Sequence, residues 1–140
     1  MQFLRDYLFL IPVVVMVLCE LVKIVLEGMR TGRWHEGMFR PGGMPSTHSA
    51  FVTSLCIVVW RKLGVQSTEF AIAFCFACIV WYDAVVVRRA VGEQGKFLNQ
   101  IQGWHHFRDR VGHSVIEVFV GIIFGMIVTG IGIGLWTWSF

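Results

Sequence analysis

Four stretches of the chain, at residues 7–26, 46–60, 70–87 and 115–138, each contain at most two charged side chains. A bilayer core about 30 Å thick is crossed by roughly 20 apolar residues of helix, so stretches of this kind are candidate membrane spans. The composition agrees, because 56% of the 140 residues are hydrophobic and the mean hydropathy is +0.67. We therefore predict an all-α integral membrane bundle of about four transmembrane helices, forming one domain over residues 1–140.

Most basic residues are expected at one membrane face, where the connections after the first and third spans meet. That face would carry Arg30, Arg33, Arg40, Arg88, Arg89, Lys96, Arg108 and Arg110, and the opposite face Arg5, Arg61 and Lys62. The positive-inside rule places the richer face in the cytoplasm of a bacterial-type inner or plasma membrane. A site built to bind phosphate would collect arginines as well.

Small residues recur along the fourth stretch as Gly121-x-x-x-Gly125 and Gly130-x-x-x-Gly134. This spacing puts the glycines on one helix face and lets another helix backbone approach closely. The partner helix could belong to the same chain or to a second copy, so a homodimer through the fourth span is a second interpretation.

The four cysteines, Cys19, Cys56, Cys75 and Cys78, all lie inside the apolar stretches. Cys75 and Cys78 lack the flanking polar or turn residues typical of a zinc or redox motif. We expect all four to be small, buried apolar residues.

A segment rich in glycine and hydroxyl groups, Gly42-Gly43-Met44-Pro45-Ser46-Thr47-His48-Ser49, leads into the second stretch. Pro45 suits the first turn of a helix, and Gly43 allows the backbone to approach a ligand closely. The free amides of that helix start, with the hydroxyls of Ser46 and Thr47, would form an anion site. His48 follows within the first turn. The alternative is an ordinary helix cap in which His48 faces lipid headgroups.

A second histidine opens the fourth stretch, within Gly112-His113-Ser114-Val115-Ile116-Glu117. His113 and Glu117 are four residues apart, so they share a helix face. A carboxylate there can accept the imidazole N–H, fix the tautomer and raise the nucleophilicity of the other nitrogen. Glu117 lies at the start of a strongly apolar helix, where an ionisable group is costly unless it is paired or functional.

Further charged residues are expected near the same face. Lys23 lies three residues after Glu20, a spacing that suits an ion pair as well as a phosphate ligand. Asp83, shortly before Arg88 and Arg89, is expected to orient an arginine rather than to act as an acid. Two histidines with several cations suit phosphoryl transfer, and the sequence contains no paired-carboxylate cage of the kind that magnesium needs.

Three blocks together resemble the divergent branch of the type 2 phosphatidic acid phosphatases, which are related to the vanadium haloperoxidases. The blocks are Gly42 to Ala50, then Tyr82-Asp83-Ala84 with Val87 to Gln94 and Leu98-Asn99, and finally Gly112-His113-Ser114 with Glu117-Val118. The resemblance runs from about residue 20 to residue 125.

The resemblance implies a role for each matching residue. His48 corresponds to the general acid and His113 to the nucleophile, and Glu117 stands where an aspartate orients that nucleophile in the larger superfamily. The expected phosphate ligands that match the superfamily blocks are Lys23, Arg30 and Ser46.

The chain departs from the superfamily pattern at two positions. Thr31 replaces a proline, and Phe107 replaces an arginine that binds phosphate. Arg108 and Arg110 are the nearer candidate replacements in sequence, but Arg88 and Arg89 are favoured because the divergent branch itself carries them.

We therefore expect a membrane-embedded, acid-phosphatase-like hydrolase that needs no metal or other cofactor. Its substrate would be a membrane lipid phosphate or a polyprenyl (di)phosphate, cleaved through a phosphohistidine on His113, and we expect no nucleic-acid partner. The alternative is a non-catalytic protein of membrane assembly that keeps the phosphate site to bind anionic lipid. Transport is less attractive, because the ionisable residues gather at one face and do not line a path across the membrane.

Overall fold

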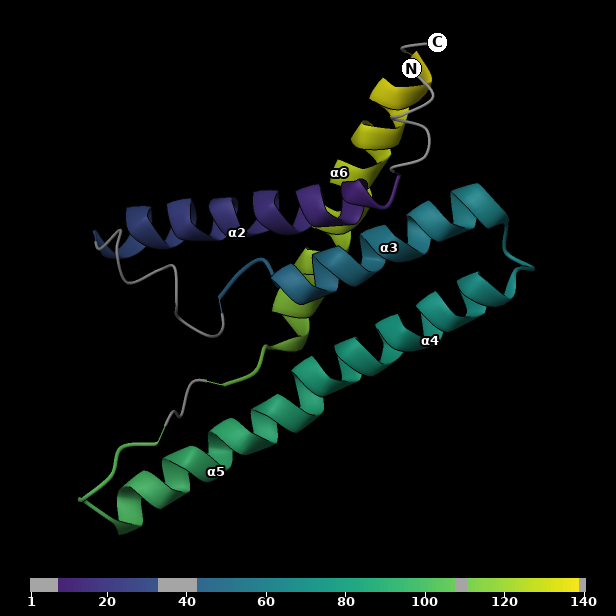
Figure 1. The fold of residues 1–140 in the computed structure, drawn as a ribbon. Helices are drawn as coiled ribbons and strands as arrows, with labels where there is room; N and C mark the ends of the chain where they lie inside the picture. The colour runs from purple at the N-terminus through teal and green to yellow at the C-terminus, as the bar shows by residue number, and fades with distance from the viewer. Residues whose placement is uncertain (1–7, 33–42, 108–110, 139–140) are drawn as a thin grey trace.

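The computed structural model describes residues 8–32, 43–107 and 111–138, and the regular structure within them is helical (Figure 1). The elements are α2 (Leu10–Thr31), α3 (Thr47–Leu63), α4 (Thr68–Tyr82), one π-helical segment η2 (Asp83–Val87), α5 (Arg88–Ile101) and α6 (Val115–Trp138). α4, η2 and α5 join into one continuous rod (Figure 1). The all-α prediction is confirmed for these residues, and the four rods accord with about four spans.

Glycines and a serine set several of the helix ends. Gly32, with φ 70°, ends α2 and donates its backbone N–H to the carbonyl of Gly28. Gly64, with φ 84°, ends α3, and the Ser67 hydroxyl accepts the Phe70 N–H at 3.1 Å to start α4. The short turn between α3 and α4 makes these helices antiparallel neighbours (Figure 1).

α3 is the central helix, because it packs against α2, α4 and α6. One core cluster joins Val52 and Cys56 of α3 to Ala73 and Ala77 of α4. A second cluster joins Ala50 of α3 to α2 residues, Val15 and Cys19, and to Phe124 and Val128 of α6. Both clusters use small side chains, so the helices approach closely.

The first glycine pair of α6 packs against α3 within the same chain. A Cβ on Gly121 would lie 2.5 Å from the Ser46 carbonyl oxygen, and one on Gly125 would lie 2.6 Å from that of Ala50. These glycines therefore bring the start of α6 against the start of α3. Around a Cβ on Gly130 no atom of the described residues lies within 4 Å. A homodimer through the second pair stays a prediction.

Large apolar side chains cover much of the described surface. Among the described residues, two helical rods are long and apolar enough to cross a membrane: Thr68–Ile101 and Val115–Leu135, with mean hydropathies of 2.3 and 2.4 over their most apolar windows. Only 17% and 22% of those windows are buried inside the protein. Apolar residues that face outward are expected where lipid is the solvent. Cys75 and Cys78 lie on this exposed surface, so the expectation of burial holds for Cys19 and Cys56 alone.

The rod that contains α4 continues beyond the expected end of the third span. The charged residues after Val87 suggested a connection, but the backbone stays helical through η2 and α5 to Ile101. Helices tolerate charged residues when these occupy one face, and α5 is amphipathic in this way. The rod therefore carries the residues around Arg88 in the middle of a long helix.

Candidate functional site

Backbone hydrogen bonds hold the starts of α3 and α6 together and fix them against η2. The Ser46 N–H donates to the Glu117 carbonyl at 3.3 Å, and the His113 N–H donates to the Ala84 carbonyl at 3.0 Å. His48 lies in the first turn of α3, and His113 directly precedes the α6 cap. The two imidazoles interact electrostatically. The predicted pair of histidines is therefore brought together.

Glu117 forms a reciprocal cap with Ser114 at the start of α6. Its side-chain Oε2 accepts the Ser114 backbone N–H at 2.8 Å, and the Ser114 hydroxyl accepts the Glu117 N–H at 3.2 Å. The same Oε2 lies 3.3 Å from Nδ1 of His113. This capping box positions the carboxylate that orients the imidazole. With Nδ1–H donating to Glu117, Nε2 of His113 keeps its lone pair for reaction.

Burial lowers the pKa of His113 from its ordinary value, and the positive charge of Lys23 and the neighbouring His48 lower it further. The charge and the hydrogen bond of Glu117 raise this pKa in part. The net effect keeps the His113 imidazole neutral at neutral pH. A neutral imidazole is the form that can attack phosphorus.

α2 contributes Lys23 together with Glu20. The sequence predicted Glu20 only as the ion-pair partner of Lys23, but Glu20 also contacts α3. Glu20 Oε1 lies 3.4 Å from the Lys23 ammonium, and Glu20 Oε2 accepts the Thr47 hydroxyl at 2.7 Å. A Cβ on Gly43 would lie 3.6 Å from Cε of Lys23, so the lysine stem runs along the glycine segment. Glu20 thus ties two expected phosphate ligands, Lys23 and Thr47, into one cluster.

Ser46, which was also expected to bind phosphate, has a fully buried side chain. Its hydroxyl forms a 2.9 Å hydrogen bond with the hydroxyl of Ser49. The residue's backbone, rather than its hydroxyl, lies against α6. In this arrangement Ser46 supports the helix start, and the hydroxyl of Thr47 is the one close to the charged groups.

The rod made of α4, η2 and α5 brings Asp83 and Arg88 to the site. Arg88 Nε lies 2.5 Å from Asp83 Oδ2, which agrees with the orienting role expected for Asp83. Both residues act electrostatically on His48. Arg89 instead pairs with Glu93 at 3.2 Å, with its side chain 62% exposed. Of the two arginines expected to replace the superfamily residue, Arg88 is the better placed.

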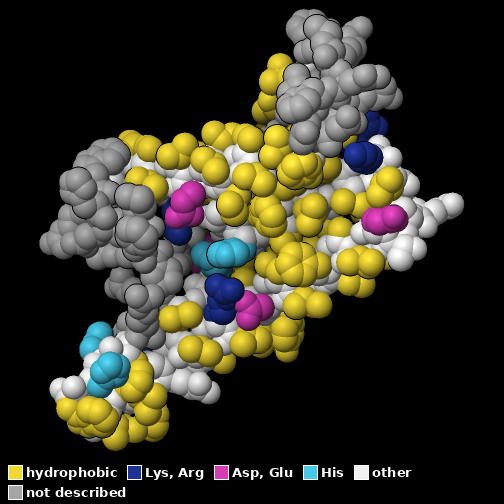
Figure 2. Space-filling model, viewed as in Figure 1, with side chains coloured by type: hydrophobic (Ala, Val, Ile, Leu, Met, Phe, Trp, Pro, Cys, Tyr) yellow, Lys and Arg dark blue, Asp and Glu magenta, His cyan; other side chains and the backbone are white. Residues whose placement is uncertain are grey.

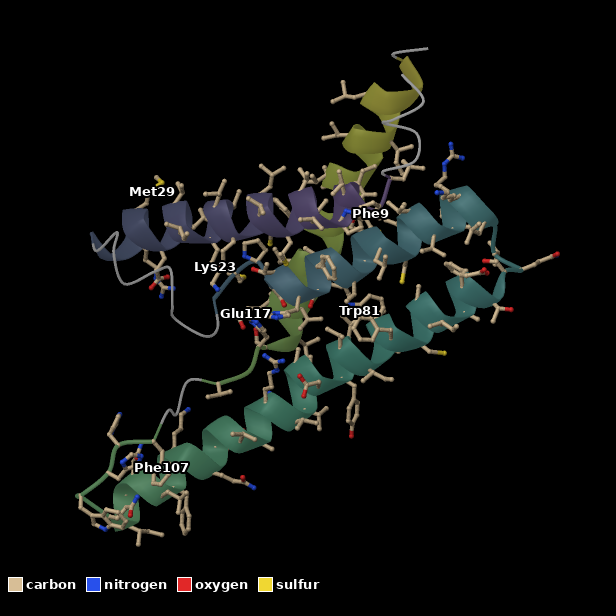
Figure 3. The ribbon with its side chains drawn as sticks, viewed as in Figure 1. Phe9, Lys23, Met29, Trp81, Phe107 and Glu117 are labelled. Carbon is tan, nitrogen blue, oxygen red and sulfur yellow. The ribbon has the colours of Figure 1, made fainter. Side chains whose placement is uncertain are left out.

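In the space-filling view, histidine side-chain atoms are exposed near the middle of the molecule, with acidic and basic side chains on either side of them (Figure 2). Lys23 and Glu117 both act on the His113 imidazole, and Figure 3 labels them on α2 and at the start of α6. The charged groups that act on the histidines are Lys23, Arg88, Glu20, Asp83 and Glu117. They come from α2, the α4–α5 rod and α6, so the candidate site joins all of these to α3.

Gly112 is a supporting residue that sequence reasoning did not single out. It has φ 98°, and a Cβ at this position would lie 2.6 Å from the backbone nitrogen of Arg89. Only glycine adopts this conformation without strain and leaves room for the neighbouring backbone. The connection can therefore pass the start of α5 and deliver His113. The only sequence signal was a glycine immediately before a candidate nucleophile.

Phe107 lies beside the far end of α5, away from Glu117 (Figure 3). Its backbone N–H and carbonyl form hydrogen bonds of 2.8 and 2.9 Å with the Asn99 side chain. Asn99 therefore closes the turn after α5. This contact gives a structural role to Asn99, one of the residues that carry the family resemblance. An arginine at position 107 would start from the same distant turn.

Other expected residues are placed away from the histidines or lie outside the described part. Arg30 is exposed in the last turn of α2, seven residues after Lys23. Arg33, Arg40, Arg108 and Arg110 lie outside the described residues, as does the start of the first stretch at residue 7. Within the described residues, no group of three or more His, Cys, Asp or Glu side chains is arranged to hold a metal ion.

Comparisons with known proteins give one family and one relative. Residues 4–128 match the model of the Divergent PAP2 family. The chain is also 27% identical over 150 residues to the uncharacterized membrane protein YuiD of Bacillus subtilis (strain 168), a match that covers 92% of this chain and 95% of that protein. No solved structure gives a significant match. The match to a membrane protein and the outward-facing apolar helices identify this chain as a membrane protein.

Proposed function

Because the chain belongs to the Divergent PAP2 family, we propose that it is a metal-independent phosphatase that hydrolyses a lipid phosphate or a polyprenyl (di)phosphate through a phosphohistidine. One observation carries this proposal: Nδ1 of His113 lies 3.3 Å from Oε2 of Glu117, and the start of α3, with His48 in its first turn, is hydrogen-bonded to the start of α6. An oriented imidazole next to a second proton-transferring group is the arrangement that nucleophilic catalysis requires.

In the first step, Nε2 of His113 attacks phosphorus and forms an N–P bond. The bond between phosphorus and the ester oxygen of the leaving group breaks, and that oxygen takes a proton from the His48 imidazolium. Lys23 and Arg88 balance the negative charge on the remaining phosphoryl oxygens. Glu117 stabilises the positive charge that develops on the His113 ring.

In the second step, water attacks the phosphohistidine and the N–P bond breaks. His48, now neutral, takes the proton of the attacking water and regains the form with which it began. Inorganic phosphate leaves, and His113 returns to its neutral state. Over both steps water is consumed and one alcohol, or one phosphorylated alcohol, is released with phosphate.

The test is phosphate release by the detergent-purified protein from a panel of lipid phosphates and polyprenyl phosphates in the presence of EDTA. We expect release from at least one member, and a loss of at least about 10³-fold in the His113→Ala variant. His105→Ala is the matched control, because His105 lies in the turn after α5 and makes an edge-to-face contact with Phe107 instead of joining the site. Release that requires an added metal, or that survives in His113→Ala, would contradict the proposal.

A second candidate function is binding of anionic lipid without turnover. The departures from the superfamily pattern favour it, because Thr31 stands in place of a proline and Phe107 in place of an arginine that binds phosphate. It predicts that His113→Ala and His48→Ala change the retention of anionic lipid during purification, while neither wild type nor variant releases phosphate.

For the sidedness we propose that the site faces the cytoplasm of a bacterial-type inner membrane. Among the described residues, Arg30, Arg88, Arg89 and Lys96 lie toward the site-bearing face, and Arg61 and Lys62 lie at the end of α3 away from it. A reporter fused after Phe140 tests this. An even number of spans puts both termini on the same side of the membrane, and that side is the outside if the site faces the cytoplasm. A reporter active only in the cytoplasm would overturn it.

A further inference from the structure

An exposed apolar stripe runs along the whole rod that joins α4, η2 and α5. Its members are Ile72 (64% exposed), Ile79 (66%), Tyr82 (63%), Val86 (44%), Phe97 (62%) and Ile101 (66%). Within α4, Tyr82 lies three residues after Ile79, and within α5, Ile101 lies four residues after Phe97, so each pair lies on one side of its own helix. Exposed apolar side chains therefore continue past Arg88 into α5.

The polar residues of α5 occupy a different face. Arg89, Glu93, Lys96 and Gln100 are all exposed and follow one another at intervals of four, three and four residues. Gly92 and Gly95 are buried on a third face. A helix with an apolar face and a separate charged face is typical of segments that lie at the surface of a bilayer.

The length of the rod fits this placement. Its 34 residues extend over about 51 Å at roughly 1.5 Å per residue, which exceeds a bilayer core of about 30 Å. A tilt of about 30° would bring the whole rod within the roughly 40–45 Å that includes the headgroup layers, and spans commonly tilt by up to about 40°. Trp104, 86% exposed just beyond the rod, is a residue type that anchors at headgroup level.

We propose that lipid covers the entire stripe, so that α5 and Trp104 lie against the headgroup layer on the site-bearing side of the membrane. The occupant is lipid because α5 belongs to the same rod as α4 and also exposes large apolar side chains. The junction of η2 and α5, which carries Asp83 and Arg88, then lies at the inner edge of the headgroup layer. This inference rests on the membrane location of the chain and not on catalysis.

The test uses one fluorescent label on each of two neighbouring faces of α5. Cys75→Ala and Cys78→Ala remove the exposed thiols, and Cys19 and Cys56 remain buried. Into this background Ile101→Cys is introduced on the stripe, and Gln100→Cys on the polar face serves as the matched control. Both variants are labelled with an environment-sensitive dye and reconstituted in vesicles of phosphatidylcholine and phosphatidylglycerol. Absence of labelling in the parent background verifies that the helices stay packed.

We expect spin-labelled lipid to quench the dye at position 101 several-fold more strongly than the dye at position 100, and aqueous iodide to show the reverse order. Equal access of iodide to both positions would overturn the inference, because α5 would then stand in water. Loss of lipid quenching at position 101 together with oxidative cross-linking of Ile101→Cys between chains would also overturn it, and would show that a second copy covers the stripe. Because these readouts report position and not turnover, they are independent of phosphatase activity.

Discussion

A single carboxylate oxygen of Glu117 lies 3.3 Å from Nδ1 of His113 and also accepts the backbone N–H of Ser114 at 2.8 Å. The cap of α6 and the orientation of the candidate nucleophile therefore depend on the same atom. A change at residue 117 can act on folding through the cap and on reactivity through the imidazole. Suitable substitutions separate these two effects.

Glu117→Gln is expected to keep the fold, and Glu117→Ala to weaken it. Glutamine can accept the Ser114 N–H as glutamate does, whereas alanine removes that half of the capping box. We expect Glu117→Ala to lower the free energy of unfolding by about 1 kcal/mol. Thermal unfolding of both variants in the same detergent measures the difference. A melting temperature of Glu117→Ala equal to that of wild type would contradict the capping role.

The pH dependence of turnover should report the lowered pKa of His113. Only the neutral imidazole attacks, so kcat/KM falls as the pH drops through this pKa. Because burial lowers the pKa, the acid limb should lie below the ordinary histidine value of about 6.5. The negative charge of Glu117 raises the pKa, so Glu117→Gln should move the limb to still lower pH.

The control for this shift is Glu69→Gln, which removes a carboxylate from the first turn of α4, at the opposite end of that helix from Asp83. Its acid limb should coincide with that of wild type. A limb above pH about 6.5 in wild type, or a shift to higher pH in Glu117→Gln, would show that a different group controls the reaction.

Gly112→Ala is expected to damage the site through the backbone. The new Cβ would collide with the backbone of Arg89, and alanine is strained at φ 98°. We expect a loss of roughly 1–3 kcal/mol in stability and a large drop in kcat as His113 moves. Gly103→Ala is the matched control, since no described atom lies within 4 Å of its Cβ. Similar stability and activity in the two variants would refute the packing role of Gly112.

Several features of the site follow from sequence spacing alone. The spacing of His113 and Glu117 predicted their contact, which the 3.3 Å separation shows, although His113 precedes α6 and the cap at Ser114 brings the two side chains together. Asp83 was expected to orient an arginine because it lies shortly before Arg88 and Arg89, and it pairs with Arg88. Such predictions succeed because only a few residues of chain separate the two groups in each pair.

Features that depend on packing between segments were harder to predict. The charged residues after Val87 suggested the end of a span, because a sequence does not reveal that a helix can carry them on one face past the membrane core. Pairing of Ser46 with Ser49, and of Glu20 with Thr47, decides which hydroxyl lies near the charged groups. The second of these contacts joins residues 27 positions apart, a separation that no local pattern encodes.

The most direct test of the account is chemical trapping of the phosphoenzyme. Wild-type protein is mixed with a radiolabelled lipid phosphate that it turns over, quenched within milliseconds in alkali, and analysed for protein-bound phosphate. We predict a phosphoryl group stable in alkali and labile in acid, as phosphohistidine is, in wild type and in His105→Ala but not in His113→Ala. Phosphorylation of His113→Ala at the wild-type level would contradict the assignment of His113 as the nucleophile.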